Sequence, residues 1–169
     1  LGFNVPRAPF NDRDVRRALS MAVDRSAMVR NVFDTLAVPG LGPVTRALPV
    51  SGDAVALPYD SAAAAKILAA HGPISFRLLV PTSSAVRMKY ATLLQEQYRH
   101  FGVKMTSEPL EVNAFVQRLT KSDFDAVLNA WHSDPSPAAV VQAWGTAGAP
   151  PAGANFAGYA SRSFDALVD

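Results

Sequence analysis

Hydrophobic residues along the chain follow two periods, one typical of helices and the other of strands. Apolar positions three and four apart predict helices within residues 14–24, 25–36, 62–72, 83–102, 112–121 and 138–145, with a last helix from residue 161. Continuous or alternating apolar runs predict strands within residues 1–5, 74–81, 103–111 and 124–131. Because helices separate the last three strands, parallel pairing is expected and the predicted fold is α/β.

Polar residues just before the helical periods predict where helices begin. Asn11 or Asp12 can cap the first helix and Ser26 the second, while Asp60 or Ser61 can open the third. The helical period also assigns inward faces. The positions expected inward on the second, fourth and fifth helices are Met28, Val29, Val32, Phe33, Leu36, Val86, Tyr90, Leu93, Leu94, Phe101, Val112, Phe115, Val116 and Leu119.

The composition narrows the class of protein. The 169 residues are the size of one domain, and 49% hydrophobic with 18% charged residues is typical of a globular protein. A net charge of +2 is too balanced to indicate a polyanion, so no nucleic acid partner is expected. No apolar run approaches the ~20 residues that span a bilayer. Without cysteine there is no disulfide, thiolate nucleophile or Cys-based zinc site.

The stretch "AWHSDPSPA", residues 130–138, follows the last predicted strand and carries candidate chemistry. Trp131, His132 and Asp134 would emerge at the carboxyl end of that strand, where open α/β sheets present ligand sites. An ionised Asp134 can accept hydrogen bonds from a ligand ammonium while Trp131 excludes water. Alternatively, Asp134 only starts a turn before Pro135. The residues alone favour the two interpretations equally.

An enzyme is the competing hypothesis. His132 and Asp134 can form an acid/base pair only if the strand continues past Trp131, because residues two apart share a face in strands. His71 and His100 fall at predicted helix ends, where the helix dipole favours them structurally. The sequence contains no nucleophile elbow, phosphate loop or dinucleotide-binding motif. The residues therefore give an enzyme no positive support, and we expect neither a cofactor nor a metal.

Taken in order, the motifs resemble a known family. The run "PFNDRDVRRALSMAVDR", the segment "YDSAAAAKILAAHG", the helix "RMKYATLLQEQYRHFGVKM", "FDAVLNAW" with "HSDPSP", and "NFAGYASRSFDALVD" are similar to the family 5 extracellular solute-binding proteins. These are the peptide- and nickel-type binding components of ABC importers. The most specific pieces are residues 9–25 and the W-x-x-D of residues 131–134.

The resemblance implies a fold and a role. The fold would be the C-terminal lobe of a type II periplasmic binding protein, with a mixed sheet and helices on both faces. Residues 1–169 would be one α/β lobe of a larger two-lobed protein, which fits a chain that starts without Met. It would be a receptor and not an enzyme: together with an N-terminal lobe, it would capture a peptide-like solute and deliver it to a membrane permease. Its location would be periplasmic or extracellular, with or without a lipid anchor.

The resemblance also implies site residues. In peptide-binding relatives the aspartate of W-x-x-D pairs with the peptide α-ammonium, which assigns Asp134, with Trp131 and His132 beside it. Dipeptide-binding relatives place a carboxylate-reading arginine in the loop where this sequence has "TSS", so Ser83 is the contact expected there. Arg87 starts the following helix instead. A nickel chelate, an opine or a sugar is the alternative to a peptide.

Overall fold

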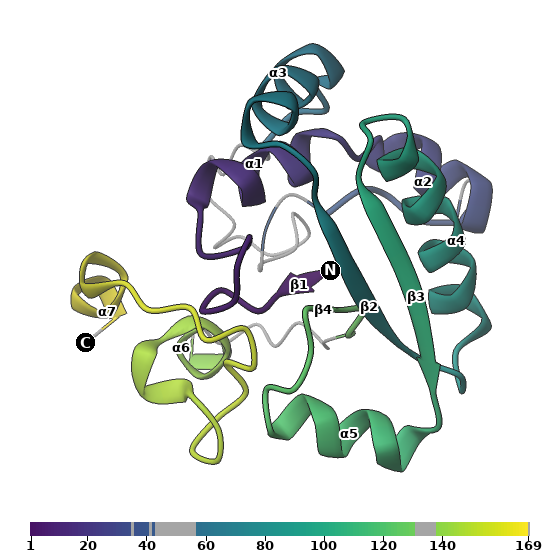
Figure 1. The fold of residues 1–169 in the computed structure, drawn as a ribbon. Helices are drawn as coiled ribbons and strands as arrows, with labels where there is room; N and C mark the ends of the chain where they lie inside the picture. The colour runs from purple at the N-terminus through teal and green to yellow at the C-terminus, as the bar shows by residue number, and fades with distance from the viewer. Residues whose placement is uncertain (35, 41, 43–56, 131–137, 169) are drawn as a thin grey trace.

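The computed structural model describes residues 1–34, 36–40, 42, 57–130 and 138–168, which contain a four-stranded sheet (Figure 1). Its order is β1-β4-β2-β3, with β2 parallel to both β3 and β4, and β1 antiparallel to β4. The bounds are β1 (Gly2–Phe3), β2 (Ser75–Pro81), β3 (Lys104–Leu110) and β4 (Ala126–Val127). The predictions of parallel pairing and of a mixed sheet are confirmed.

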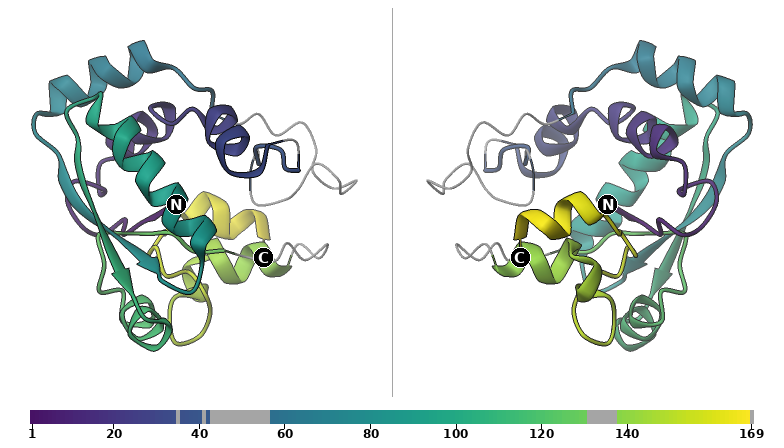
Figure 2. Two further views of the ribbon diagram at one scale, coloured as in Figure 1. Left: turned by 90° about the vertical axis from the view of Figure 1, so that its right-hand side faces the viewer. Right: turned by 90° about the vertical axis from the view of Figure 1, so that its left-hand side faces the viewer.

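Helices cover both faces of the sheet, as predicted (Figures 1 and 2). Phe76, Leu78 and Val80 of β2 point to one face and join the larger core under α1 (Arg13–Met21), α2 (Arg25–Phe33), α3 (Ser61–His71) and α4 (Ala85–Arg99). Leu79 points to the other face and packs with Phe115 of α5 (Val112–Thr120). The alternation of side chains along a strand therefore builds two cores from one apolar run.

Side-chain caps set most helix starts. Asp12 accepts from the Asp14 amide at 2.7 Å, and Asp60 accepts from the Ala63 amide at 2.9 Å, so both predicted acidic caps are present. The prediction for α2 is wrong. Asp24, not Ser26, accepts from the Ala27 amide, at 2.8 Å. The cap is two residues earlier than predicted, because the carboxylate of Asp24 is placed to satisfy a free amide at the start of the helix.

Several positions predicted to face inward are exposed. Leu36 is 88% exposed because α2 ends at Phe33, where Asp34 takes a positive φ of 55° and turns the chain away. Val86 is 39% exposed, and the buried residues of α4 are Ala91, Leu94 and Tyr98. On α5, Val112 and Val116 are 42% and 46% exposed. Helical period gives the direction of a face but not how far the neighbouring layer reaches along it.

β4 is shorter than its predicted run of residues 124–131, because ladder pairing covers only Ala126 and Val127. Single hydrogen bonds extend the contact at both ends: the Asn4 amide donates to the Asp125 carbonyl at 2.9 Å, and the Leu128 amide donates to the Leu79 carbonyl at 2.9 Å. The buried Asn4 side chain also donates to the Phe124 carbonyl at 2.8 Å. These bonds hold the segment after β1 against the chain that leads into β4.

An aromatic cluster fills the centre of the larger core. Phe76 contacts Phe3, Phe10 and Tyr98 edge-to-face, with ring centroids 6.2, 5.2 and 6.0 Å away. Phe3 and Phe10 stack at 4.7 Å. The Tyr98 hydroxyl donates to the Leu19 carbonyl at 3.2 Å. Burial raises the pKa of Tyr98, so this hydroxyl stays protonated and keeps its role as a donor.

A closed ring of alternating charges, which we call the charge ring, lies near the segment between α5 and β4. Its members, each paired with the next and the last with the first, are Arg7, Asp125, Arg77, Glu108, Arg118 and Asp123. Apart from the shorter Arg118–Glu108 contact, the N···O distances run from 3.0 to 3.7 Å. The ring joins the segment after β1 to β2, β3, α5 and the start of β4.

The last part of the described chain forms a separate group of short helices beside the sheet (Figure 1). It contains α6 (Ala138–Trp144), the 3-10 turn η2 (Thr146–Gly148) and α7 (Arg162–Val168). Asn155, 1% exposed, donates to the carbonyls of Gly145 and Tyr159 at 3.0 and 2.7 Å and accepts from the Tyr159 amide at 3.1 Å. This one buried amide therefore holds the loop between η2 and α7.

Candidate functional site

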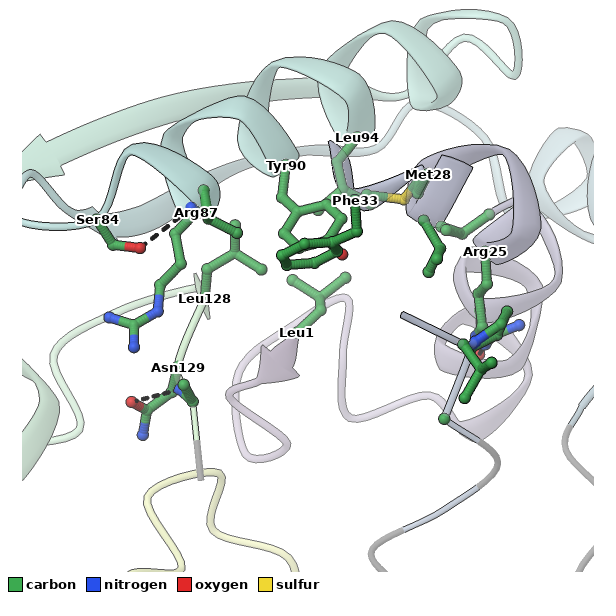
Figure 3. A pocket seen from close by; sticks show the side chains of 18 of the residues that line it. Leu1, Arg25, Met28, Phe33, Ser84, Arg87, Tyr90, Leu94, Leu128 and Asn129 are labelled. Carbon is green, nitrogen blue, oxygen red and sulfur yellow. Dashed lines mark hydrogen bonds between the residues drawn. The ribbon is translucent and has the colours of Figure 1, made fainter. Parts of the chain in front are cut away.

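A cavity of about 630 Å³ opens where β2 and β4 end, which is the edge that parallel strands offer to ligands (Figure 3). We call it the main cavity. It lies between α2, the first turns of α4, the start of β1 and the residues just after β4. Its lining residues are Leu1, Phe3, Ser20, Val23, Arg25, Met28, Val29, Phe33, Val38, Pro39, Gly40, Ser84, Val86, Arg87, Tyr90, Leu94, Tyr98, Leu128, Asn129 and Ala130.

Aromatic and aliphatic side chains form most of the wall. Phe33 from α2 and Tyr90 from α4 meet edge-to-face with ring centroids 6.0 Å apart, and both point into the cavity above Leu1 (Figure 3). Burial raises the pKa of the Tyr90 hydroxyl, so this part of the wall stays uncharged. Met28 and Leu94 lie behind the two rings. The wall is therefore apolar. Because Phe33 and Tyr90 are only half-buried, an apolar ligand group can cover their exposed surface and displace the water there.

Polar groups gather at the end of the cavity nearest the sheet. Arg87 extends from the first turn of α4 toward Asn129, which follows β4 (Figure 3). Ser84 caps α4 by accepting from the Arg87 amide at 3.3 Å. The Asn129 oxygen accepts from the Ala130 amide at 2.9 Å, which leaves the side-chain NH₂ of Asn129 without a partner in the described part of the chain. Arginine and amide donors thus face the same space.

The described residues of the cavity wall carry positive charge and include no compensating carboxylate. Among its described lining residues the charged ones are Arg25 and Arg87, and none is acidic. Arg25 is already held, donating to the Ser20 hydroxyl at 2.5 Å and to the Leu57 carbonyl at 3.1 Å. No hydrogen bond or ion pair joins the Arg87 guanidinium to another described residue. A half-buried guanidinium in this state has donors available for an anionic group.

A smaller cavity of about 230 Å³ lies on the other side of β1 and β4. Leu1 and Asn129 line both cavities, so the two meet at the residues flanking the β1–β4 pair. Trp144 of α6 and Phe156 form part of the smaller wall. Trp144 is half-buried beside this cavity, whereas Phe124 is fully buried at 1% exposure.

Of the four predicted site residues, the structure describes only Ser83. Trp131, His132 and Asp134 lie outside the described residues, so their roles stay predictions. Ser83 is exposed in the turn between β2 and α4 and lines neither cavity, whereas its neighbour Ser84 lines the main one. Arg87 does reach the cavity although it belongs to a helix. The sequence pattern did not single out Asn129, because a polar residue at a strand end has no periodic signal.

Other candidate chemistry does not assemble in the described residues. No group of three metal-binding side chains occurs there, and His71 and His100 lie at the ends of α3 and α4, as the sequence predicts. The His100 Nε2 atom is 3.6 Å from Oε1 of Glu96, which lies one turn earlier on the exposed surface of α4. The helices in the described ranges include none that is both long and apolar enough to cross a bilayer.

The arrangement defines a class of protein: an α/β fold with a partly cationic cavity of about 630 Å³ at the carboxyl ends of its strands. Residues 1–150 match the bacterial extracellular solute-binding proteins, family 5, in the middle part of that family's sequence. The chain therefore belongs to this family, as the motifs predict. The family is one of solute-binding proteins rather than enzymes.

One relative is similar to most of this chain in sequence, and its solved structure is similar in fold. The oligopeptide-binding protein AppA of Bacillus subtilis is 27% identical over 151 residues, covering 78% of this chain and 28% of AppA. The chain thus spans little more than a quarter of that relative. The AppA structure in complex with a nonapeptide superposes with a TM-score of 0.84, 24% identity and coverage of 98% of this chain and 36% of that one.

A second solved structure shares the fold. NikZ from Campylobacter jejuni, in complex with Ni(L-His), superposes with a TM-score of 0.86 and 22% identity, covering 99% of this chain and 37% of that one. At these identities the two structures establish the fold alone. The predicted periplasmic-binding-protein fold, with a mixed sheet and helices on both faces, is confirmed.

Proposed function

We propose that residues 1–169 form one lobe of the solute-binding component of an ABC importer, and that its solute is a peptide. The observation that carries this is Arg87: a guanidinium at a ligand-sized cavity with no acidic partner among the described residues. A peptide carboxylate supplies the missing charge, and the first turn of α4, with its free amides and positive dipole end, favours an anion at the same place. The similarity to AppA, which is named an oligopeptide-binding protein, supports a peptide as the solute.

The proposed mechanism involves no bond breaking. A second, N-terminal lobe would close over the solute, and the closed form would be presented to a membrane permease outside the cytoplasmic membrane. The carboxylate of the peptide would lie against Arg87 and Asn129. Its α-ammonium would pair with Asp134, the role that the family motif assigns to that residue. Because affinity is drawn from both lobes, the isolated lobe is expected to bind peptides weakly.

Replacing Arg87 with methionine tests the proposal. Methionine keeps most of the apolar stem and removes the charge, so affinity of the full-length protein for tripeptides is expected to fall about tenfold or more, the cost of losing a charge-assisted contact. Isothermal titration calorimetry measures the effect. Arg30→Met, at an exposed position of α2 that lines neither cavity, is the matched control and should leave affinity unchanged.

Two results decide where the carboxylate binds and which class of solute the protein takes. If Arg87→Met binds a peptide as tightly as the wild type does, the carboxylate site lies elsewhere and this assignment is wrong. A thermal-shift screen with peptides, opines, sugars and nickel chelates then decides the solute class, since a ligand that binds the folded state raises its midpoint. A stabilising effect that is lost in Asp134→Ala would support the ammonium site, and an equal effect in both proteins would leave Asp134 as a turn residue.

A further inference from the structure

We propose that the main cavity selects a peptide whose carboxyl-terminal residue has a large apolar side chain, with an aromatic one preferred. The inference rests on the proposed function, because it takes the Arg87 end of the cavity as the carboxylate site. The observation behind it is the division of the cavity: cationic and polar at Arg87 and Asn129, and apolar from there to α2.

The order of these parts fixes which side chain of the peptide meets the apolar wall. A terminal carboxylate and the side chain of the same residue are attached to one carbon atom. If the carboxylate lies at Arg87, that side chain can enter only the space next to it, where Leu128, Tyr90 and Phe33 point inward (Figure 3). A more distant residue of the peptide would lie toward the opening.

The wall is shaped for an aromatic ring. Phe33 and Tyr90 already meet edge-to-face at 63°, and a third ring can extend this contact because edge-to-face and offset pairs are the favoured arrangements. Met28, 7% exposed, contributes a polarisable sulfur that also suits aromatic neighbours. The half-buried rings lose their remaining water when such a side chain covers them.

The charges of the cavity act against the alternatives. A lysine or arginine side chain would enter a space bordered by Arg25 and Arg87, with no carboxylate among the described lining residues to offset the repulsion. An acidic side chain attached beside the carboxylate would lie against Leu128, Tyr90 and Phe33. The second arginine, Arg25, already donates to Ser20 and Leu57. A small side chain such as that of alanine would leave the apolar side chains of the wall exposed to water. Size and charge therefore favour the same class of side chain.

Calorimetric titration of the full-length protein with Ala-Ala-Phe, Ala-Ala-Ala and Ala-Ala-Lys tests the inference. We expect Ala-Ala-Phe to bind about tenfold tighter than Ala-Ala-Ala, from the apolar area that the ring buries, and Ala-Ala-Lys to bind most weakly. In Phe33→Ser the preference for phenylalanine over alanine should shrink to about threefold or less. Tyr59→Ser, which removes an aromatic residue that is 51% exposed and lines neither cavity, should keep the preference.

Each outcome has a distinct meaning. Equal affinity for the three peptides, or a preference for lysine, overturns the inference and leaves the proposed peptide-binding function intact. A preference for phenylalanine that persists in Phe33→Ser overturns the assignment to this wall. Failure of every peptide to bind refutes the proposed function, and the inference falls with it. The comparison of peptides on the wild-type protein remains decisive even if Phe33→Ser does not fold.

Discussion

Replacing Phe76 with alanine is expected to destabilise the folded protein by about 3–5 kcal/mol, the usual cost of removing a buried phenylalanine side chain. Phe76 is 4% exposed and contacts three other aromatic rings from β1, the loop before α1, and α4. Truncation leaves a cavity that these rings cannot fill without leaving their own contacts. Three elements distant in sequence lose a common partner at once.

Denaturant unfolding of the full-length protein, followed by a signal from residues 1–169, measures the loss. Val116→Ala is the matched control, because Val116 is 46% exposed on α5 and its truncation should change stability by less than about 0.5 kcal/mol. A loss below about 1 kcal/mol for Phe76→Ala would show that the core repacks, and that the aromatic cluster is not what joins β1 to β2 and α4.

Replacing Asp125 with alanine is expected to cost about 2 kcal/mol, because it removes a partly buried carboxylate that makes several contacts. Asp125 pairs with Arg7 at 3.0 Å and with Arg77 at 3.7 Å, and it accepts from the Arg77 backbone amide at 3.0 Å. Its loss opens the charge ring on both sides. The backbone amide of β2 also loses its partner, which a simple surface ion pair would not involve.

The control for the charge ring is Glu96→Ala, which breaks the exposed Glu96–Arg99 pair of α4, where the side chains are 55% and 71% exposed. Such pairs contribute about 0–1 kcal/mol, so the two variants should differ clearly in urea unfolding. In 1 M salt the ionic part of the Asp125 effect should shrink, since the screening length falls to about 3 Å. Equal losses for the two variants would show that the charge ring adds no more than a surface pair.

The fold was largely predictable because local patterns carried it. Apolar runs in β2 and β3 marked both long strands, and the helical periods located α1, α3, α4 and α5 to within a few residues. The prediction of a helix cap failed where two polar residues lie close together, as at Asp24 and Ser26, since both can accept a backbone hydrogen bond. The prediction of buried side chains failed at helix ends, as at Leu36 and Val86, where the neighbouring layer of the structure stops.

The candidate site was less predictable. Arg87 looked like the start of a helix and nothing more, because its role depends on which strand ends lie opposite it. Phe33 and Tyr90 were predicted to face inward, but period cannot distinguish a side chain that packs in a core from one that lines a cavity. Ser83 was expected at the ligand and is exposed outside both cavities, while Ser84, one residue later, lines the main one.

The sequence by itself determined the α/β class, the family and the order of the elements, because each depends on residues that are close along the chain. Only the tertiary structure decided that β4 lies between β1 and β2, that six charged residues from five segments close into a ring, and that Arg87, Asn129 and the Phe33–Tyr90 pair face one space. These are contacts between segments up to 125 residues apart, as between Gly2 and Val127. They depend on packing of whole layers, which no local period encodes.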